Sequence, residues 1–217
     1  MIMPIIASRR KRVIVDVDTQ THFFKNSGIV CVQNHRLVLA NILRVVNWAR
    51  LKSIHMISTM QILPSKYAYC NSYIADIDGQ KKIGYTFRKR RASFDAEDNT
   101  DLLPGILDQY EQVIFHKRCF DPFAEPRADR MLSELRADEF IVIGALTEGA
   151  VKATALGLLA RHKNVIVLVD ATGSYDMTVG EITLRLLLER GAKLIDTKTF
   201  LGSPCLQLAG THDLNRF

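Results

Sequence analysis

The sequence lacks any apolar run of the roughly 18 residues that a membrane-spanning helix needs. It has few cysteines, and Cys31, Cys70, Cys119 and Cys205 are scattered without a C-x-x-C pair, so we expect free thiols rather than a zinc knuckle or a disulfide framework. It shows no internal repeat and no low-complexity tract. The first twelve residues are too short for a secretory signal and carry their charge on the wrong side. The expected compartment is therefore the cytoplasm, with no membrane partner.

The composition is that of an ordinary soluble protein. The chain has 217 residues, of which 47% are hydrophobic and 24% charged, which suits a single domain spanning residues 1–217. Its net charge of +6 is concentrated in residues 9–12 and 88–91. Basic runs are usually solvated surface, and no aromatic-rich stacking motif accompanies either one. Nucleic acid is therefore not an expected partner.

Short apolar runs rich in β-branched residues alternate with segments of helical periodicity. The pattern predicts helices at 36–51, 128–136, 148–161 and 178–190, the last ending at Gly191. Six strands are predicted at 12–18, 53–59, 112–117, 139–145, 164–171 and 192–197. This alternation indicates a three-layer α/β/α fold whose doubly wound, mainly parallel sheet is covered on both faces.

One long segment falls outside the alternation. Residues 60–100 are irregular, polar and basic, with Asp78-Gly79 as an expected turn. Loops of this length commonly serve as lids or arms. We expect residues 60–100 to form an inserted arm or lid, with an oligomer contact as the alternative.

Candidate chemistry lies where the predicted strands end, because open parallel sheets bind ligands beyond their carboxyl ends. The first strand ends at Asp18 and the third at His116-Lys117. The fourth is followed by the turn 144–150, where a helix begins, and the fifth ends near Asp170.

These segments resemble the isochorismatase-like hydrolases of the cysteine-hydrolase superfamily. Residues 18–24 resemble the D-x-Q-x-x-F opening, and Lys117 with residues 120–123 resembles K-x-x-x-[SD]-x-F. Residues 144–154, GALTEGAVKAT, resemble the nucleophile turn G-x-x-T-[ED]-x-C-V-x-x-T, and residues 169–172 match the strand that follows. The four segments occur in the family's order along nearly the whole chain. The resemblance implies a six-stranded sheet of order 3-2-1-4-5-6 and a homo-oligomer.

The resemblance also implies a catalytic triad whose nucleophile is missing. Asp18 takes the place of the general acid/base, Lys117 that of the cation that activates the thiol, and Ala150 that of the cysteine. Thr147, Gly149 and Ala150 would form the oxyanion turn, with the family's non-proline cis peptide expected near 146–147. Alanine has no nucleophilic atom, so covalent acyl transfer through position 150 is excluded.

The expected partner is a small-molecule substrate or ligand, and the basic residues near the site would suit an anionic one. Gln20 and Phe23 belong to the opening motif, while Arg88 and Arg91 on the arm would clamp carboxylates. No cofactor is expected. The nicotinamidase branch carries metal ligands after its second strand, but residues 58–64 contain neither histidine nor acid, so no metal is expected.

Two side chains near the expected site have competing interpretations. Asp16, two residues before Asp18, should share its face of the strand and competes for its role. Cys119 follows Lys117 closely, but we expect a buried small side chain there rather than a substitute nucleophile.

Three functions are compatible with this sequence. In the first, the chain is a non-catalytic or impaired family member that keeps the fold for assembly or ligand binding. Alternatively, it is a thiol-independent vinyl-ether hydrolase of the isochorismatase type with Asp18 as general acid, or a cysteine amide hydrolase carrying a cysteine-to-alanine substitution at position 150.

Overall fold

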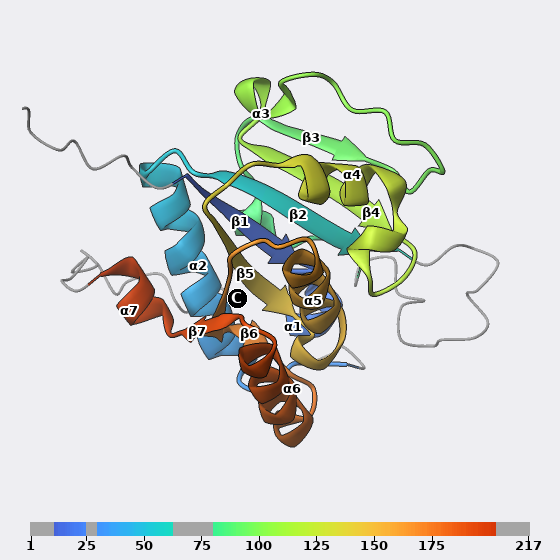
Figure 1. Cartoon of the computed structure of the whole chain (residues 1–217). Helices are drawn as coiled ribbons and strands as arrows, with labels where there is room; N and C mark the ends of the chain where they lie inside the picture. The colour runs from blue at the N-terminus through green and yellow to red at the C-terminus, as the bar shows by residue number, and fades with distance from the viewer. Residues whose placement is uncertain (1–10, 25–29, 63–79, 203–217) are drawn as a thin grey trace, which may run out of the picture.

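A seven-stranded parallel sheet forms the centre of the protein (Figure 1). The computed structural model describes residues 11–24, 30–62 and 80–202. The sheet order is β3-β4-β2-β1-β5-β6-β7, and every neighbouring pair is parallel. The strands are β1 (Arg12–Val17), β2 (His55–Gln61), β3 (Arg91–Phe94), β4 (Gln112–Lys117), β5 (Glu139–Ala145), β6 (Val165–Gly173) and β7 (Lys193–Ile195).

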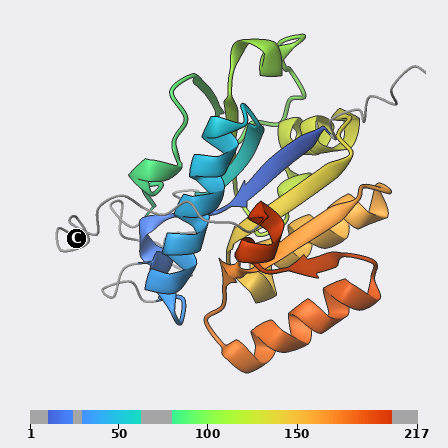
Figure 2. The ribbon, with the colours of Figure 1, turned by 90° about the vertical axis from the view of Figure 1, so that its left-hand side faces the viewer.

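Helices cover both faces of this sheet. One face is covered by α1 (Thr21–Phe24), α2 (His35–Leu51) and α7 (Thr197–Leu201), with α2 and α7 in front of the sheet in Figure 2. The other carries α4 (Pro126–Glu134), α5 (Lys152–Ala160) and α6 (Met177–Glu189). The remaining short helices are η2 (Gly84–Thr86), α3 (Ile106–Gln109), η3 (Pro122–Ala124) and η4 (Thr147–Val151). No helix in the described ranges is long and apolar enough to cross a membrane.

The predicted α/β/α fold is confirmed, with one correction to the sheet. The six predicted strands correspond to β1, β2, β4, β5, β6 and β7 and keep their predicted order. The seventh strand, β3, comes from the segment expected to be irregular and pairs with the outer edge of β4. Its four residues alternate only between exposed and partly buried positions. Such a short, half-exposed edge strand leaves no apolar run in the sequence.

The part of the 60–100 segment that the structure describes packs against the sheet. Gln20 and Lys82 form an antiparallel bridge. The Thr21 N–H donates to the Lys81 carbonyl (2.8 Å), and the Ile83 N–H donates to the Thr19 carbonyl (3.0 Å). Residues 80–83 therefore lie along the loop that follows β1. The expected turn at Asp78-Gly79 lies outside the described residues.

Two apolar clusters fill the space between the sheet and its helices. Along β1, Val13, Val15 and Val17 belong to the cluster beneath α4, α5 and α6, whereas Ile14 belongs to the cluster beneath α2. Because side chains alternate along a strand, each cluster identifies one face of the sheet. We call them the α5 face and the α2 face.

Candidate active site

Asp18 and Lys117 form a fully buried ion pair at the carboxyl end of the sheet. Lys117 Nζ donates to Asp18 Oδ2 at 2.6 Å, and neither side chain is exposed to solvent. The Thr59 hydroxyl donates to the other carboxylate oxygen at 2.7 Å. The structure thus brings together the two residues that resemble the family's acid and amine, although they lie 99 positions apart.

Lys117 is buried at the end of the interior strand β4. It is the last residue of β4, beside Gln61 of β2, and β3 occupies the edge that the family resemblance implied for this strand. Its ammonium reaches across β2 to Asp18 and also donates to the Cys119 carbonyl at 3.0 Å. Buried charges are stable only when paired and hydrogen-bonded in this way.

The backbone at Asp18 turns its carboxylate to the α5 face. Asp18 follows the last residue of β1 and has a positive φ of 46°. Its partner Thr59 alternates with Ser58 on β2, and Ser58 donates to Asp16 at 3.0 Å. Adjacent strand residues point to opposite faces, so Asp16 lies on the α2 face. The expectation that Asp16 and Asp18 share a face is therefore wrong.

Ala150 lies in the turn between β5 and α5, with its side chain buried. Thr147, Gly149 and Ala150, the predicted oxyanion residues, all fall within η4. The predicted cis peptide is present one bond earlier than expected, at Ala145–Leu146. Gly144 has a φ of 122°, and a Cβ there would lie 1.9 Å from the Val17 carbonyl oxygen. A glycine is required for β5 to pass this close to the residue before Asp18.

Cys119 does not take the place of the missing thiol in this structure. Its side chain is exposed, contrary to the expectation of a buried one, and its thiol donates to the Asp121 carbonyl at 3.4 Å. Only its backbone carbonyl contacts the ion pair, through Lys117.

Gln20 and Phe23 are buried and engaged within the protein. The Gln20 amide donates to the carbonyls of Gln61 (3.0 Å) and Gln80 (2.7 Å), and its oxygen accepts from the Gln61 N–H (2.8 Å). Phe23 is part of the apolar cluster on the α2 face. In this structure Gln20 therefore joins β2, the loop after β1 and the 80–83 segment.

The structure places Arg88 and Arg91 away from the Asp18–Lys117 pair. Arg91 is level with Gln112, the first residue of β4, whereas Lys117 is its last. At about 3.3 Å per residue, the two ends of β4 are roughly 16 Å apart. Arg88 is buried and donates to the Ile54 carbonyl (3.2 Å), and its guanidinium lies 3.5 Å from Glu111. Arg91 is exposed and lies over the ring of Phe87.

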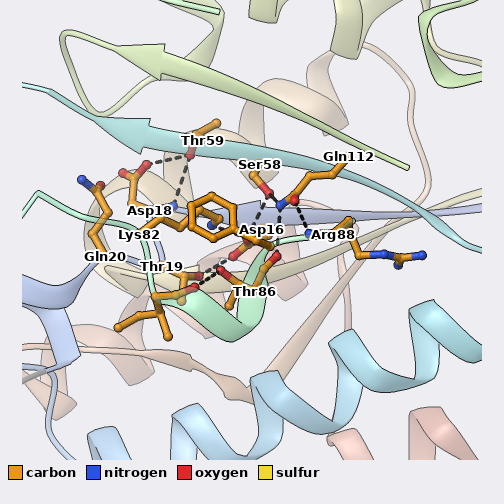
Figure 3. Close-up of polar contacts among 12 residues, drawn as sticks. Asp16, Asp18, Thr19, Gln20, Ser58, Thr59, Lys82, Thr86, Arg88 and Gln112 are labelled. Carbon is orange, nitrogen blue, oxygen red and sulfur yellow. Dashed lines mark hydrogen bonds and ion pairs between the residues drawn. The ribbon is translucent and has the colours of Figure 1, made fainter. Parts of the chain in front are cut away.

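A second buried ion pair, which the sequence reasoning missed, lies on the α2 face. Lys82 Nζ donates to Asp16 Oδ2 at 2.5 Å, with both side chains fully buried. The Thr19 hydroxyl donates to the other Asp16 oxygen. Figure 3 shows this cluster alongside Asp18 and Thr59. The two acids at the end of β1 therefore have separate lysine partners on opposite faces.

The Asp16 cluster extends through polar side chains to the start of β4. The Gln112 amide donates to the Ser58 hydroxyl (2.7 Å) and to the Thr86 carbonyl (3.1 Å), and its oxygen accepts from the Arg88 N–H (2.7 Å). Burial, followed by the negative charge of Asp16, raises the pKa of the neighbouring Tyr85. The signal in the sequence was Asp16 itself, because an acid inside a buried strand requires a partner.

The donor set of this region does not favour a metal. Asp16 and Asp18 point to opposite faces, and each is paired with a lysine. Within residues 11–24, 30–62 and 80–202, no three His, Cys, Asp or Glu side chains are grouped as metal ligands.

Comparison with known proteins agrees with this fold. Residues 12–199 match the model of the isochorismatase domain family. An isochorismatase-like hydrolase from Alkaliphilus metalliredigens has 20% identity and a TM-score of 0.68, over 88% of this chain and 97% of that one. The MAR1 ribonuclease from Caenorhabditis elegans has 19% identity and a TM-score of 0.62, over 88% and 80%. A zinc-bound pyrazinamidase from Pyrococcus horikoshii has 18% identity and a TM-score of 0.66, over 86% of this chain and 99% of that one.

At these identities the solved structures show a shared fold and no shared substrate. No curated protein matches the chain. The family match, by contrast, covers most of the sequence and includes the residues of the buried pair and of the turn. The chain therefore belongs to the isochorismatase family.

Proposed function

We propose that this chain is an isochorismatase-family protein that does not carry out cysteine-dependent acyl transfer. The observation that carries the proposal is Ala150, a buried methyl group in the turn where the resemblance implies the nucleophile. Acyl transfer of this type needs a thiolate that forms a covalent intermediate. Two cysteines lie in the described residues. Cys119 is exposed and its thiol donates a hydrogen bond to the Asp121 carbonyl. Burial raises the pKa of the Cys31 thiol.

A direct test is to search for a covalent intermediate. The wild-type chain and Ala150→Cys would be incubated with activated esters and amides and examined by intact-protein mass spectrometry. We expect an acyl adduct and turnover in Ala150→Cys alone. Ala150→Gly, which also lacks a nucleophile, is the matched control. An acyl adduct on the wild-type chain would contradict the proposal.

The same experiment addresses a cysteine amide hydrolase that carries a substitution at position 150. In that case Ala150→Cys restores efficient turnover of the natural amide, rather than slow turnover of activated substrates alone. Comparing the rates of Ala150→Cys on activated and unactivated amides separates a substituted amide hydrolase from a family member that has no acyl-transfer activity of its own.

A thiol-independent vinyl-ether hydrolase is the second candidate, and the buried Asp18–Lys117 pair favours it. Burying two charges costs several kcal/mol of desolvation. A protein that serves only as a scaffold gains no function from this cost. Both Asp18 oxygens already accept hydrogen bonds, so to act as a general acid Asp18 would first have to lose one of these bonds and take up a proton, from the Lys117 ammonium or from water. Vinyl-ether cleavage that is abolished by Asp18→Asn and preserved in Ala150→Gly would establish this activity.

We propose a small molecule, rather than nucleic acid, as the ligand of the site. The basic run 88–91 lies away from the Asp18–Lys117 pair: Arg88 is buried and donates to the Ile54 carbonyl, and the exposed Arg91 is level with Gln112, the first residue of β4. The ribonuclease similarity shows the fold alone. Titration with small carboxylates, compared with single-stranded RNA of matched charge, tests this choice.

A further inference from the structure

Asp18 holds a backbone conformation that is unfavourable for its residue type. Its φ of 46° lies in the left-handed region, where the Cβ of any residue other than glycine comes too close to the backbone. Such a conformation persists only where the surrounding structure enforces it. A regular continuation of β1 would instead point the carboxylate to the α2 face, away from Lys117. The contacts around Asp18 therefore decide whether the ion pair with Lys117 forms.

The carboxylate of Asp16 closes a loop around Asp18. One of its oxygens accepts from the hydroxyl of Thr19, the residue that directly follows Asp18. The other oxygen accepts from the Ser58 hydroxyl on β2 (3.0 Å) and from Lys82 Nζ (2.5 Å). All four of these side chains are buried (Figure 3). The chain before Asp18 is thus tied to the chain after it.

Lys82 also anchors the backbone that lies against this loop. Gln20 and Lys82 form an antiparallel bridge, and the Ile83 N–H donates to the Thr19 carbonyl at 3.0 Å. The backbone that follows Asp18 is therefore held from outside by a segment whose own link to the interior is the Lys82 ammonium.

We propose that Asp16 and Lys82 are positioning residues for Asp18. By holding Thr19 and the backbone beside it, they keep Asp18 in the left-handed conformation, and so keep its carboxylate on Lys117. They act from the opposite face of the sheet, without contact to the Asp18–Lys117 pair. This role is independent of the reaction that the pair supports.

The double variant Asp16→Val with Lys82→Met separates positioning from stabilisation of the fold. It leaves no unpaired charge at this cluster, so a pair that served stability alone would be replaced without effect on Asp18. We expect the contact between Asp18 and Lys117 to be lost, because the Thr19 hydroxyl no longer has its acceptor. Thr19→Val keeps both charges of the cluster and removes only that hydroxyl, and it should weaken the contact in the same direction.

The readout is the contact itself rather than an activity. Crystal structures of the variants give the φ of Asp18 and the distance from Lys117 Nζ to its carboxylate. In solution, NMR of lysine ammonium groups labelled with ¹⁵N measures how fast Lys117 exchanges its protons with water. We expect this exchange to become at least about ten-fold faster in the double variant, because a buried, hydrogen-bonded group is protected from exchange.

Arg12→Met is the matched control. Arg12 is the first residue of β1 and pairs with Glu139 at 2.6 Å, so the substitution removes a cation at the other end of the same strand. It should leave the φ of Asp18 and the exchange of Lys117 unchanged, and circular dichroism checks that each variant is folded. An unchanged contact in the double variant would overturn the proposal, as would an unchanged contact in Thr19→Val if the double variant does not fold, or an equal effect of Arg12→Met.

Discussion

One backbone conformation sets the chemistry at the end of β1. A regular strand would have carried Asp18 to the same face as Asp16. The positive φ of Asp18 instead turns its carboxylate toward Thr59 and Lys117 on the α5 face. Asp16 pairs with Lys82 on the α2 face. The two acids therefore do not compete for one role. Asp18 has the neighbours expected of a family acid, while Asp16 joins the 80–88 segment to the sheet.

The Asp16–Lys82 pair should be far more sensitive to loss of one partner than to loss of both. We expect Lys82→Met to lower the free energy of unfolding by about 3–5 kcal/mol, because a buried carboxylate is left without its cation. Asp16→Val combined with Lys82→Met should cost less than Lys82→Met alone, since neither charge of this pair remains buried. Urea denaturation measures both.

An exposed ion pair provides the comparison. Arg130 lies 3.3 Å from Glu134 on α4, and both are exposed. Arg130→Met should cost no more than about 1 kcal/mol. If Lys82→Met costs as little, the structural role assigned to Lys82 is wrong.

Among the helices and strands, connections between short elements position the site. The turn that leads from β5 to α5 begins beside the end of β1, because Gly144 allows close contact with Val17. β3 covers the edge of β4 from Gln112 to Phe115, so that β4 is an interior strand. Both features depend on backbone contacts that the apolar pattern of the sequence does not encode.

The start of α6 offers a quantitative test at this level. The Asp176 carboxylate accepts from the N–H groups of Thr178 (2.8 Å) and Val179 (3.1 Å), which caps the helix. Asp176→Ala should destabilise the protein by about 1 kcal/mol, whereas Asp176→Ser should keep most of the stability. Thermal unfolding followed by circular dichroism distinguishes the two variants. Equal losses in both would mean that the cap contributes little.

Across the entire fold, two separate apolar clusters hold one sheet between two helical layers. Partly buried titratable groups at their margins link stability to pH. Burial lowers the pKa of His55 on β2, and the positive charges of Lys11 and Arg88 lower it further. The folded state therefore binds a proton at this histidine less readily than the unfolded chain does.

The expected consequence is a loss of stability in mild acid. With a depressed pKa in the folded state, stability is complete above the unfolded value of about 6.5 and declines as the pH falls through the lower folded value. Urea denaturation at pH about 7.5 and about 5.5 should show this decline, and His55→Gln should reduce it. An unchanged pH dependence in His55→Gln would assign the effect to other groups.

The sequence by itself determined the α/β/α class, six of the seven strands and their order, and the residues of the acid–amine pair. It could do so because buried parallel strands and amphipathic helices leave strong local patterns, and because the motif segments follow the family's order. Only the tertiary structure decided the addition of β3, the separation of Asp16 from Asp18, and the pairing of Asp16 with Lys82. These features arise from a single backbone angle and from contacts between residues up to 66 positions apart, and neither produces a period in the sequence.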